Sequence, residues 1–172
     1  ASVILPVHGE IDVTLRALLA IVRTRDTTPF EIVVADDASP DGAGEALAVA
    51  LDGIPGIKIV RNETNLGFLR TCNAAAAGVS APFLYLLNND TIVLDGWLDE
   101  LVATFELVPE AGLVGAKLVY PDGRLQEAGG VVWADGSAAN VGRCDDPEAP
   151  PYNFMRDADY VSGAAILVRT AA

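Results

Sequence analysis

The sequence is poor in cysteine, in basic residues and in long hydrophobic runs. Its two cysteines, Cys72 and Cys144, are too few for a disulfide framework and favour a reducing compartment. The 11 basic residues are outnumbered by 24 acidic ones, and the net charge of −13 repels nucleic acid and anionic membrane on average. No apolar run has the length of a membrane span, and the first residues do not form a signal-peptide pattern. We therefore expect a protein that binds no nucleic acid and has no transmembrane segment.

The common phosphate-binding loops are also absent. Residues 6–10, at the end of the first predicted strand and in the loop after it, contain no GxGxxG, and no P-loop lysine motif occurs. The basic side chains Arg61, Arg70, Lys117 and Arg124 are scattered along the chain. If this acidic chain binds a diphosphate, something else must supply positive charge, and a divalent cation would do so.

Short β-branched runs alternate with segments of helical period over the first 110 residues. The hydrophobic content of 51% is ample for a core, and the length suits one domain. We expect strands at 2–7, 30–35, 57–60 and 83–87, with helices between them and a fourth helix at 97–107. This alternation predicts an α/β fold with a mainly parallel sheet covered on both faces.

The pattern changes after residue 110. Residues 112–120 are expected to form a strand, 121–123 a tight turn and 125–133 a returning segment. Residues 134–158 show no clear period, and 160–168 are predicted to form one more strand.

Polar residues also predict where the helices begin. Asp12 and Asp95 occupy N-cap positions for the first and fourth helices. For the second helix, Ser39 has the position of the N-cap and Pro40 that of the first helical residue. Asp41 is then expected in the first turn, where the helix dipole favours an anion.

The apolar run at 83–87 leads directly into Asn88, Asn89 and Asp90. If this run is a buried parallel strand, its polar end lies at the carboxyl edge of the sheet, where ligands of open α/β folds bind. Asp90 offers a hard oxygen ligand suited to Mg²⁺ or Mn²⁺, and the two amides suit a sugar or ribose. A simple turn is the alternative interpretation.

Asp36 and Asp37 end the second predicted strand in the same way. Either both cap the following helix, or one is a cap and the other contacts a nucleobase or ribose. His8, the only histidine, follows the first strand, so it either touches a base or is simply solvated.

Taken together, these segments resemble the inverting family-2 glycosyltransferases, which have the GT-A fold. The resemblance covers nearly the whole chain, in the segments 2–7, 33–41, 65–68 with Asn73, 87–91, and 120–123 followed by 126–130. It implies a GT-A (Rossmann-like) three-layer sandwich with a mainly parallel central sheet that is C-terminally incomplete. The single domain would span residues 1–172, with a nucleotide-sugar-binding part at 1–110 and the start of the acceptor-side part at 111–172.

The resemblance also implies roles for individual residues. Pro6 and His8 would line the nucleobase pocket, and Asp37 would contact the base. The DxD metal motif of the family falls on residues 88–90, so Asp90 would hold Mn²⁺ or Mg²⁺ and Asn89 would face the ribose or a metal-bound water. The first carboxylate of that motif is an amide here. The expected donor-binding residues are Pro6, His8, Asp36, Asp37, Asn88 and Asn89.

The reaction implied by the resemblance is inverting transfer of a sugar from a UDP-, dTDP- or GDP-linked donor. The acceptor would be a glycan or a lipid-linked acceptor, in the synthesis of polysaccharide or cell-surface glycan. The catalytic base of the family would lie after Ala172, so residues 1–172 alone are expected to be inactive. We expect a cytoplasmic location, with peripheral attachment to the inner face of the membrane as a variant. A non-catalytic nucleotide-sugar binding module and a receiver-type phosphoacceptor domain are the alternatives.

Overall fold

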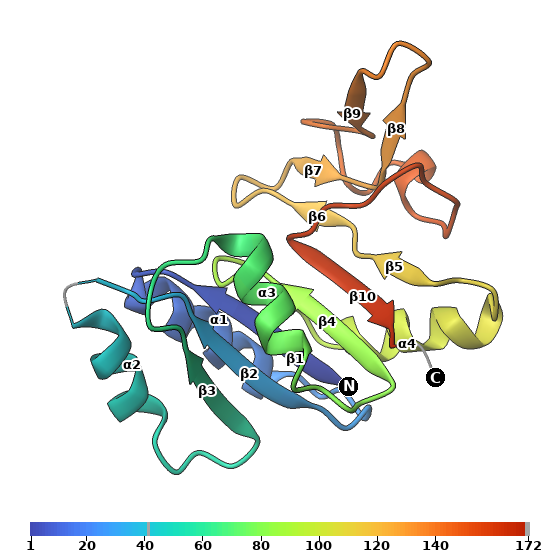
Figure 1. The fold of residues 1–172 in the computed structure, drawn as a ribbon. Helices are drawn as coiled ribbons and strands as arrows, with labels where there is room; N and C mark the ends of the chain where they lie inside the picture. The colour runs from blue at the N-terminus through green and yellow to red at the C-terminus, as the bar shows by residue number, and fades with distance from the viewer. Residues whose placement is uncertain (41, 171–172) are drawn as a thin grey trace.

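The computed structural model describes residues 1–40 and 42–170, and its centre is a six-stranded sheet (Figure 1). The strand order is β3-β2-β1-β4-β10-β5. β1 to β4 run parallel, whereas β10 is antiparallel to both β4 and β5. In chain order the strands are β1 Ser2–Val7, β2 Glu31–Asp36, β3 Ile57–Arg61, β4 Phe83–Leu87, β5 Leu113–Gly115 and β10 Ala165–Arg169. The predicted α/β fold with a mainly parallel sheet is confirmed.

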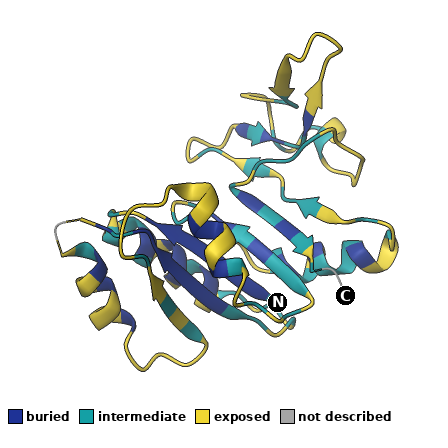
Figure 2. Cartoon of the chain, viewed as in Figure 1, coloured by how far each residue is buried: buried dark blue, intermediate teal, exposed yellow. Residues whose placement is uncertain are grey.

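Helices cover both faces of this sheet. The helices are α1 Ile11–Arg23, α2 Ala43–Leu51, α3 Phe68–Ala76 and α4 Trp97–Leu107. Because side chains alternate along a strand, Val3 and Leu5 of β1 join a core with α1, α2 and α4, while Ile4 points to the α3 side. Figure 2 shows the buried residues concentrated in β1 and β2.

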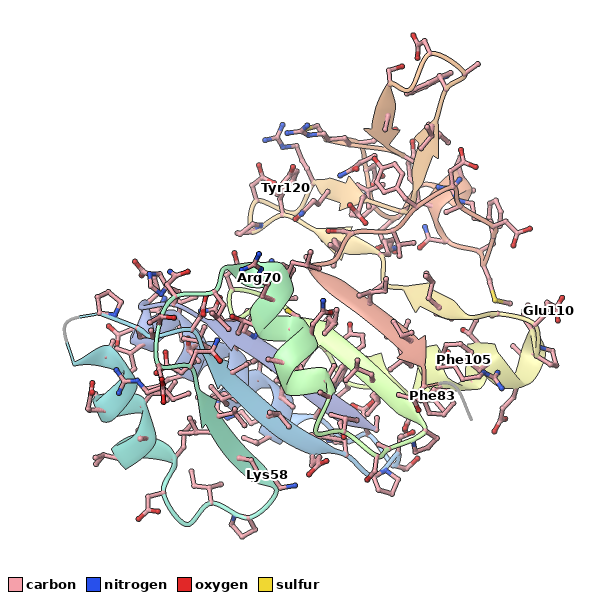
Figure 3. All side chains as sticks on the ribbon, in the orientation of Figure 1. Lys58, Arg70, Phe83, Phe105, Glu110 and Tyr120 are labelled. Atoms are coloured by element: carbon pink, nitrogen blue, oxygen red, sulfur yellow. The ribbon has the colours of Figure 1, made fainter. Side chains whose placement is uncertain are left out.

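Aromatic contacts fix α4 against the sheet. The ring centroids of Phe105 in α4 and Phe83 in β4 lie 5.0 Å apart, and Figure 3 shows the two side chains together. The guanidinium of Arg169 in β10 lies 5.0 Å from the Phe105 centroid. Strands far apart in sequence therefore share one helix as their cover. Among the described residues, no helix combines the length and hydropathy that a membrane crossing requires.

The segment after α4 differs from the prediction. Residues 112–120 do not form one strand, because β5 joins the main sheet while β6 (Leu118–Val119) pairs with β7 (Leu125–Glu127). A side chain at Gly115 would lie 2.5 Å from Val161, so the chain is closely covered where it leaves the sheet. β8 (Gly130–Val132) pairs with β9 (Ala138–Asn140), and a short 3₁₀ helix, η1, covers Pro150–Tyr152. These hairpins lie beyond the carboxyl end of β4 (Figure 1).

The helix starts also differ from those predicted. α1, α2 and α4 each follow a residue with left-handed φ that makes no side-chain cap bond, namely Glu10, Gly42 and Gly96. A left-handed residue turns the chain sharply into the helix and sets the first helical residue. The prediction that Asp12, Ser39 and Asp95 are N-caps is therefore wrong. Asp41 lies outside the described residues.

The start of α4 is satisfied instead by a distant loop. Asp26 Oδ1 accepts hydrogen bonds from the backbone N–H groups of Leu98 (2.8 Å) and Asp99 (3.0 Å). In return, the Asp99 carboxylate accepts from the N–H groups of Thr27 (2.8 Å) and Thr28 (2.7 Å). Hydrogen bonds from Thr28 and Thr27 lower the pKa of Asp99 to about 2. This reciprocal pair, which we call the Asp26–Asp99 clasp, ties α4 to the loop after α1.

Candidate functional site

A cavity of about 240 Å³ lies where β1, β2 and β4 end. Parallel strands bring their carboxyl ends to one edge, so polar residues that follow separate strands meet there. The lining residues are Pro6, Val7, His8, Asp37, Phe68, Thr71, Asn88, Asn89 and Asp90. We call this the strand-end cavity. Of the predicted site residues, only Asp36 is not in its lining.

Asp37 is buried in the wall of this cavity, with 5% of its surface exposed. Its Oδ1 accepts hydrogen bonds from Asn62 Nδ2 and from the Leu66 N–H, both at 2.8 Å. Its Oδ2 accepts from the Gly67 N–H at 2.8 Å. Burial alone raises the pKa of Asp37, but the hydrogen bonds from Leu66, Asn62, Thr71 and Gly67 outweigh it and lower the pKa. Asp37 is thus an ionised anchor for the loop that leads into α3.

Asp36 lies beneath the cavity and is fully buried. Its Oδ1 accepts from the Ser39 N–H at 2.9 Å, and Arg61 Nε lies 3.2 Å from its Oδ2. A Cβ on Gly44 would lie 2.2 Å from that same oxygen, so α2 approaches this ion pair closely. These surroundings give Asp36 a structural role as a turn cap and ion-pair partner, with no access to the cavity.

The imidazole of His8 is held from two sides. Its Nδ1 lies 2.9 Å from the backbone oxygen of Asp37, and a carbonyl can only accept, so Nδ1 carries the proton. Asn65 Nδ2 lies 3.3 Å from Nε2. The Ser39 hydroxyl accepts from the Gly9 N–H at 2.8 Å, which fixes the loop that bears the ring. His8 therefore presents Nε2 as an acceptor.

Residues 88–90 are anchored at their first two positions and open at the third. The Asn88 N–H donates to the Ala164 oxygen at 2.9 Å, just before β10. Asn89 Nδ2 donates to the hydroxyl of Thr14, a buried residue of α1, at 2.9 Å. Asp90 is exposed, and within the described residues its carboxylate accepts no hydrogen bond. This carboxylate is available to a ligand or cation.

The donor set at the cavity fits a cation that is shared with a ligand. Among the described residues, no three His, Cys, Asp or Glu side chains gather into a metal cluster. One carboxylate, Asp90, stands beside the amides of Asn88 and Asn89. Mg²⁺ is commonly bound by one or two carboxylates together with substrate phosphates. The residues present therefore suit a divalent cation that arrives with a diphosphate.

Sequence reasoning missed several residues of this site. Asn62 follows β3 as Asn88 follows β4, so the same strand-end argument applied to β3 identifies it. Thr71 and Phe68 line the cavity from α3, and Thr14 orients Asn89 from α1. The positions of these three residues depend on how helices pack against the sheet.

Two carboxylates on the hairpin side are already engaged. Glu127 has 2% of its surface exposed, and its Oε1 accepts from the Ser162 N–H at 2.9 Å. Asp159 Oδ2 accepts from the Val132 N–H at 2.8 Å. Both hold backbone segments in place.

The family model described as glycosyl transferase family 2 matches residues 2–154. The O-antigen biosynthesis protein RfbC of Myxococcus xanthus is 48% identical over 69 residues, which are 40% of this chain and 5% of that protein. Across the curated relatives that it matches, the chain spans between 5% and 35% of their length.

Solved structures show the same fold. The mannosyltransferase PcManGT from Pyrobaculum calidifontis, in complex with GDP-Man and Mn²⁺, is 22% identical with a TM-score of 0.61. The match covers 70% of this chain and 36% of that one. S. aureus TarS 1-349 in complex with UDP-GlcNAc is also 22% identical, with a TM-score of 0.62 and coverage of 72% and 35%.

Proposed function

The chain belongs to glycosyltransferase family 2, with the GT-A fold, and on that premise we propose that it binds a nucleotide-diphosphate sugar in the strand-end cavity. The whole protein would transfer the sugar to an acceptor hydroxyl with inversion, in cell-surface polysaccharide synthesis. The observation that carries this proposal is the convergence of His8, Asp37 and Asp90 on one cavity at the carboxyl edge of the sheet.

The size of the cavity suggests which part of the donor it holds. Its 240 Å³ is below the roughly 300–1,000 Å³ of typical ligand pockets. We assign it to the nucleobase and ribose of a UDP-, dTDP- or GDP-linked sugar. His8 Nε2 would accept a hydrogen bond from the base in place of the one from Asn65 Nδ2, and Pro6 and Phe68 would supply apolar contacts. Asp37 would act chiefly by holding the wall of the cavity, since three internal donors already occupy its carboxylate.

Asp90 would hold Mn²⁺ or Mg²⁺ together with the diphosphate, and Asn88 and Asn89 would contribute amide oxygens or contact the ribose. When bound, the cation would neutralise charge on the departing diphosphate. The chain otherwise carries a net charge of −13, so a cation is needed to admit a polyanion. The neighbour solved with GDP-Man and Mn²⁺ is consistent with this assignment. A cytoplasmic location is favoured by the two free cysteines.

Calorimetry tests the assignment of Asp90. Titration of UDP and GDP into the chain should give affinities at least about tenfold higher with Mn²⁺ than with EDTA, as expected for a shared cation. Asp90→Asn should remove that difference. Asp52→Asn, which removes the same charge from the exposed end of α2, should preserve it. Equal affinity with and without metal in the unmodified chain would refute the proposed site.

We further propose that the catalytic base lies outside residues 1–172. Inverting transfer needs a base within hydrogen-bond reach of the acceptor hydroxyl. On the hairpin side, Glu127 and Asp159 already accept backbone hydrogen bonds. Residues 1–172 alone should therefore bind the donor sugar nucleotide but show no acceptor-dependent transfer, as a non-catalytic module would. Acceptor-dependent release of nucleotide by the 172-residue chain would contradict this and direct attention to the exposed Asp157.

A further inference from the structure

A second cavity, of about 420 Å³, lies between the β6–β7 turn and the segment after β9. Its lining residues are Tyr120, Pro121, Asp122, Arg124, Arg143 and Cys144. Figure 3 labels Tyr120 at the start of this turn, away from the main sheet. We call it the hairpin cavity. It shares no residue with the strand-end cavity.

Positive side chains outnumber negative ones in this lining. Arg124 is paired with Asp122, whose Oδ2 lies 2.8 Å from Nε and 2.7 Å from Nη2. Arg143 has no ion pair and no side-chain hydrogen bond within the described part of the chain. The lining thus carries one net positive charge, in a chain whose overall charge is −13. An uncompensated guanidinium in such a chain favours one anionic group.

Backbone hydrogen bonds hold the two sides of the cavity together. The Cys144 N–H donates to the Leu125 oxygen at 2.7 Å, and the Leu125 N–H donates to the Asp145 oxygen at 2.8 Å. A Cβ on Gly142, which has φ 74°, would lie 2.4 Å from Leu125, so the chain before Arg143 is closely packed. The backbones that carry Arg124 and Arg143 are therefore held before any ligand binds, which reduces the entropy cost of binding.

We propose that the hairpin cavity binds an acidic sugar unit of the acceptor glycan. Arg143 would bind a phosphate or carboxylate group, for which guanidinium geometry is well suited. The Asp122–Arg124 pair offers adjacent acceptors and donors to sugar hydroxyls, and the Tyr120 ring offers an apolar face. The volume falls in the usual range for small-ligand sites. This inference rests on the proposed function, because it identifies the ligand as an acceptor.

Cys144 provides a reporter inside the cavity. It is exposed, whereas Cys72, the only other cysteine, has 3% of its surface exposed. Alkylation of Cys144 by iodoacetamide, followed by mass spectrometry, can be measured with glucose 6-phosphate, glucuronic acid or glucose present. Each acidic sugar that fits should slow alkylation in a saturable way, and glucose at the same concentration should not. Protection by only one acidic sugar would support the proposal and identify the preferred anion.

Variants separate a specific site from general charge effects. Arg143→Ala should weaken protection by the acidic sugar about tenfold, the expected value for one charge-assisted hydrogen bond. Arg23→Ala removes the same charge from the last turn of α1 and should leave protection unchanged. The proposal is overturned if neither acidic sugar protects Cys144, if glucose protects equally, or if the two variants behave alike.

Failure of the hairpin-cavity proposal can be distinguished from failure of the proposed function. Binding of UDP with Mn²⁺ reports on the strand-end cavity, and Arg143→Ala should leave it unchanged. If the chain binds UDP but no acidic sugar protects Cys144, only the hairpin-cavity proposal fails. If acidic sugars protect Cys144 but no nucleotide binds, the hairpin cavity is supported as an acidic-sugar site, while its assignment to an acceptor is overturned with the proposed function.

Discussion

Replacement of Asp37 by asparagine should destabilise the fold, because it acts on a buried anchor of the strand-end cavity. The carboxylate accepts three hydrogen bonds at 2.8 Å, from Asn62 Nδ2 and from the N–H groups of Leu66 and Gly67. Asparagine has nearly the same shape but only one acceptor oxygen. If this oxygen replaces Oδ1, the amide NH₂ group faces the Gly67 N–H, and two donors then oppose each other.

The magnitude follows from these three contacts. Two charge-assisted bonds become neutral ones, at a cost of about 1 kcal/mol each, and the third is lost with its donor left unpaired, at about 1–3 kcal/mol. Part of this loss in stability is offset, because the asparagine variant no longer has to bury the charged carboxylate of Asp37. We expect the free energy of unfolding to fall by about 3 kcal/mol at about pH 7.

Urea denaturation monitored by circular dichroism measures this difference. Asp52→Asn is the control, since Asp52 is exposed and its replacement should change the free energy by less than about 0.5 kcal/mol. The pKa of Asp37 is lowered in the folded state, so its stabilisation is present above the ordinary carboxyl pKa of about 4. It is lost as pH falls through the lowered folded pKa. The gap between the unmodified chain and Asp37→Asn should therefore narrow below about pH 4.

Two results would refute this reasoning. A loss of less than about 1 kcal/mol at neutral pH would mean that the three hydrogen bonds do not anchor the loop before α3. If the difference in free energy of unfolding between the unmodified chain and Asp37→Asn stays constant through the acid range, the ionisation of Asp37 does not contribute to stability. Hydrogen exchange at the Leu66 and Gly67 amides gives a local check, because both should exchange faster in Asp37→Asn.

Two further predictions concern stability. Gly44→Ala should lower the free energy of unfolding, measured by thermal denaturation, by about 1–3 kcal/mol, because the new Cβ would lie 2.2 Å from Asp36 Oδ2. Gly78→Ala is the control and should be tolerated, because the atom nearest to its Cβ would be 3.7 Å away. Asp99→Asn should lower the melting temperature at neutral pH by weakening the Asp26–Asp99 clasp. The pKa of Asp99 is lowered to about 2, so this difference should persist in mild acid and vanish only as pH falls toward that value. Equal stability of Gly44→Ala and Gly78→Ala would contradict the first prediction. An unchanged melting temperature of Asp99→Asn at neutral pH would contradict the second.

The positions of β1 to β4 and the chemistry at their carboxyl ends could be predicted from the sequence. The apolar runs ending at Val7, Ala35 and Leu87 are short and β-branched or aromatic, and their length excludes helices. Once parallel pairing is inferred, the polar residues that follow must meet at one edge. This is why His8, Asp37 and Asp90 were expected together and line one cavity.

The helix starts could not be predicted because they depend on the backbone. Glu10 adopts φ 50°, which few non-glycine residues do, and no local pattern signals it. The donors at the start of α4 are satisfied by Asp26, far away in the sequence. Likewise, nothing local distinguishes Asp36 from Asp37, since their different burial and partners arise only when β3, Ser39 and residues 62–67 pack around them.

The order in which the sheet is assembled has consequences for folding. β10 comes after all the other described strands in sequence, yet it lies between β4 and β5 and pairs with both. During synthesis, β1 to β4 can pair as soon as they emerge, whereas one edge of β4 stays open until residues 165–169 appear. An open hydrophobic edge can pair with another chain. Closing it early would require a contact between distant parts of the sequence, which forms slowly. Until β10 arrives, this edge of β4 is therefore a place where the nascent chain can aggregate.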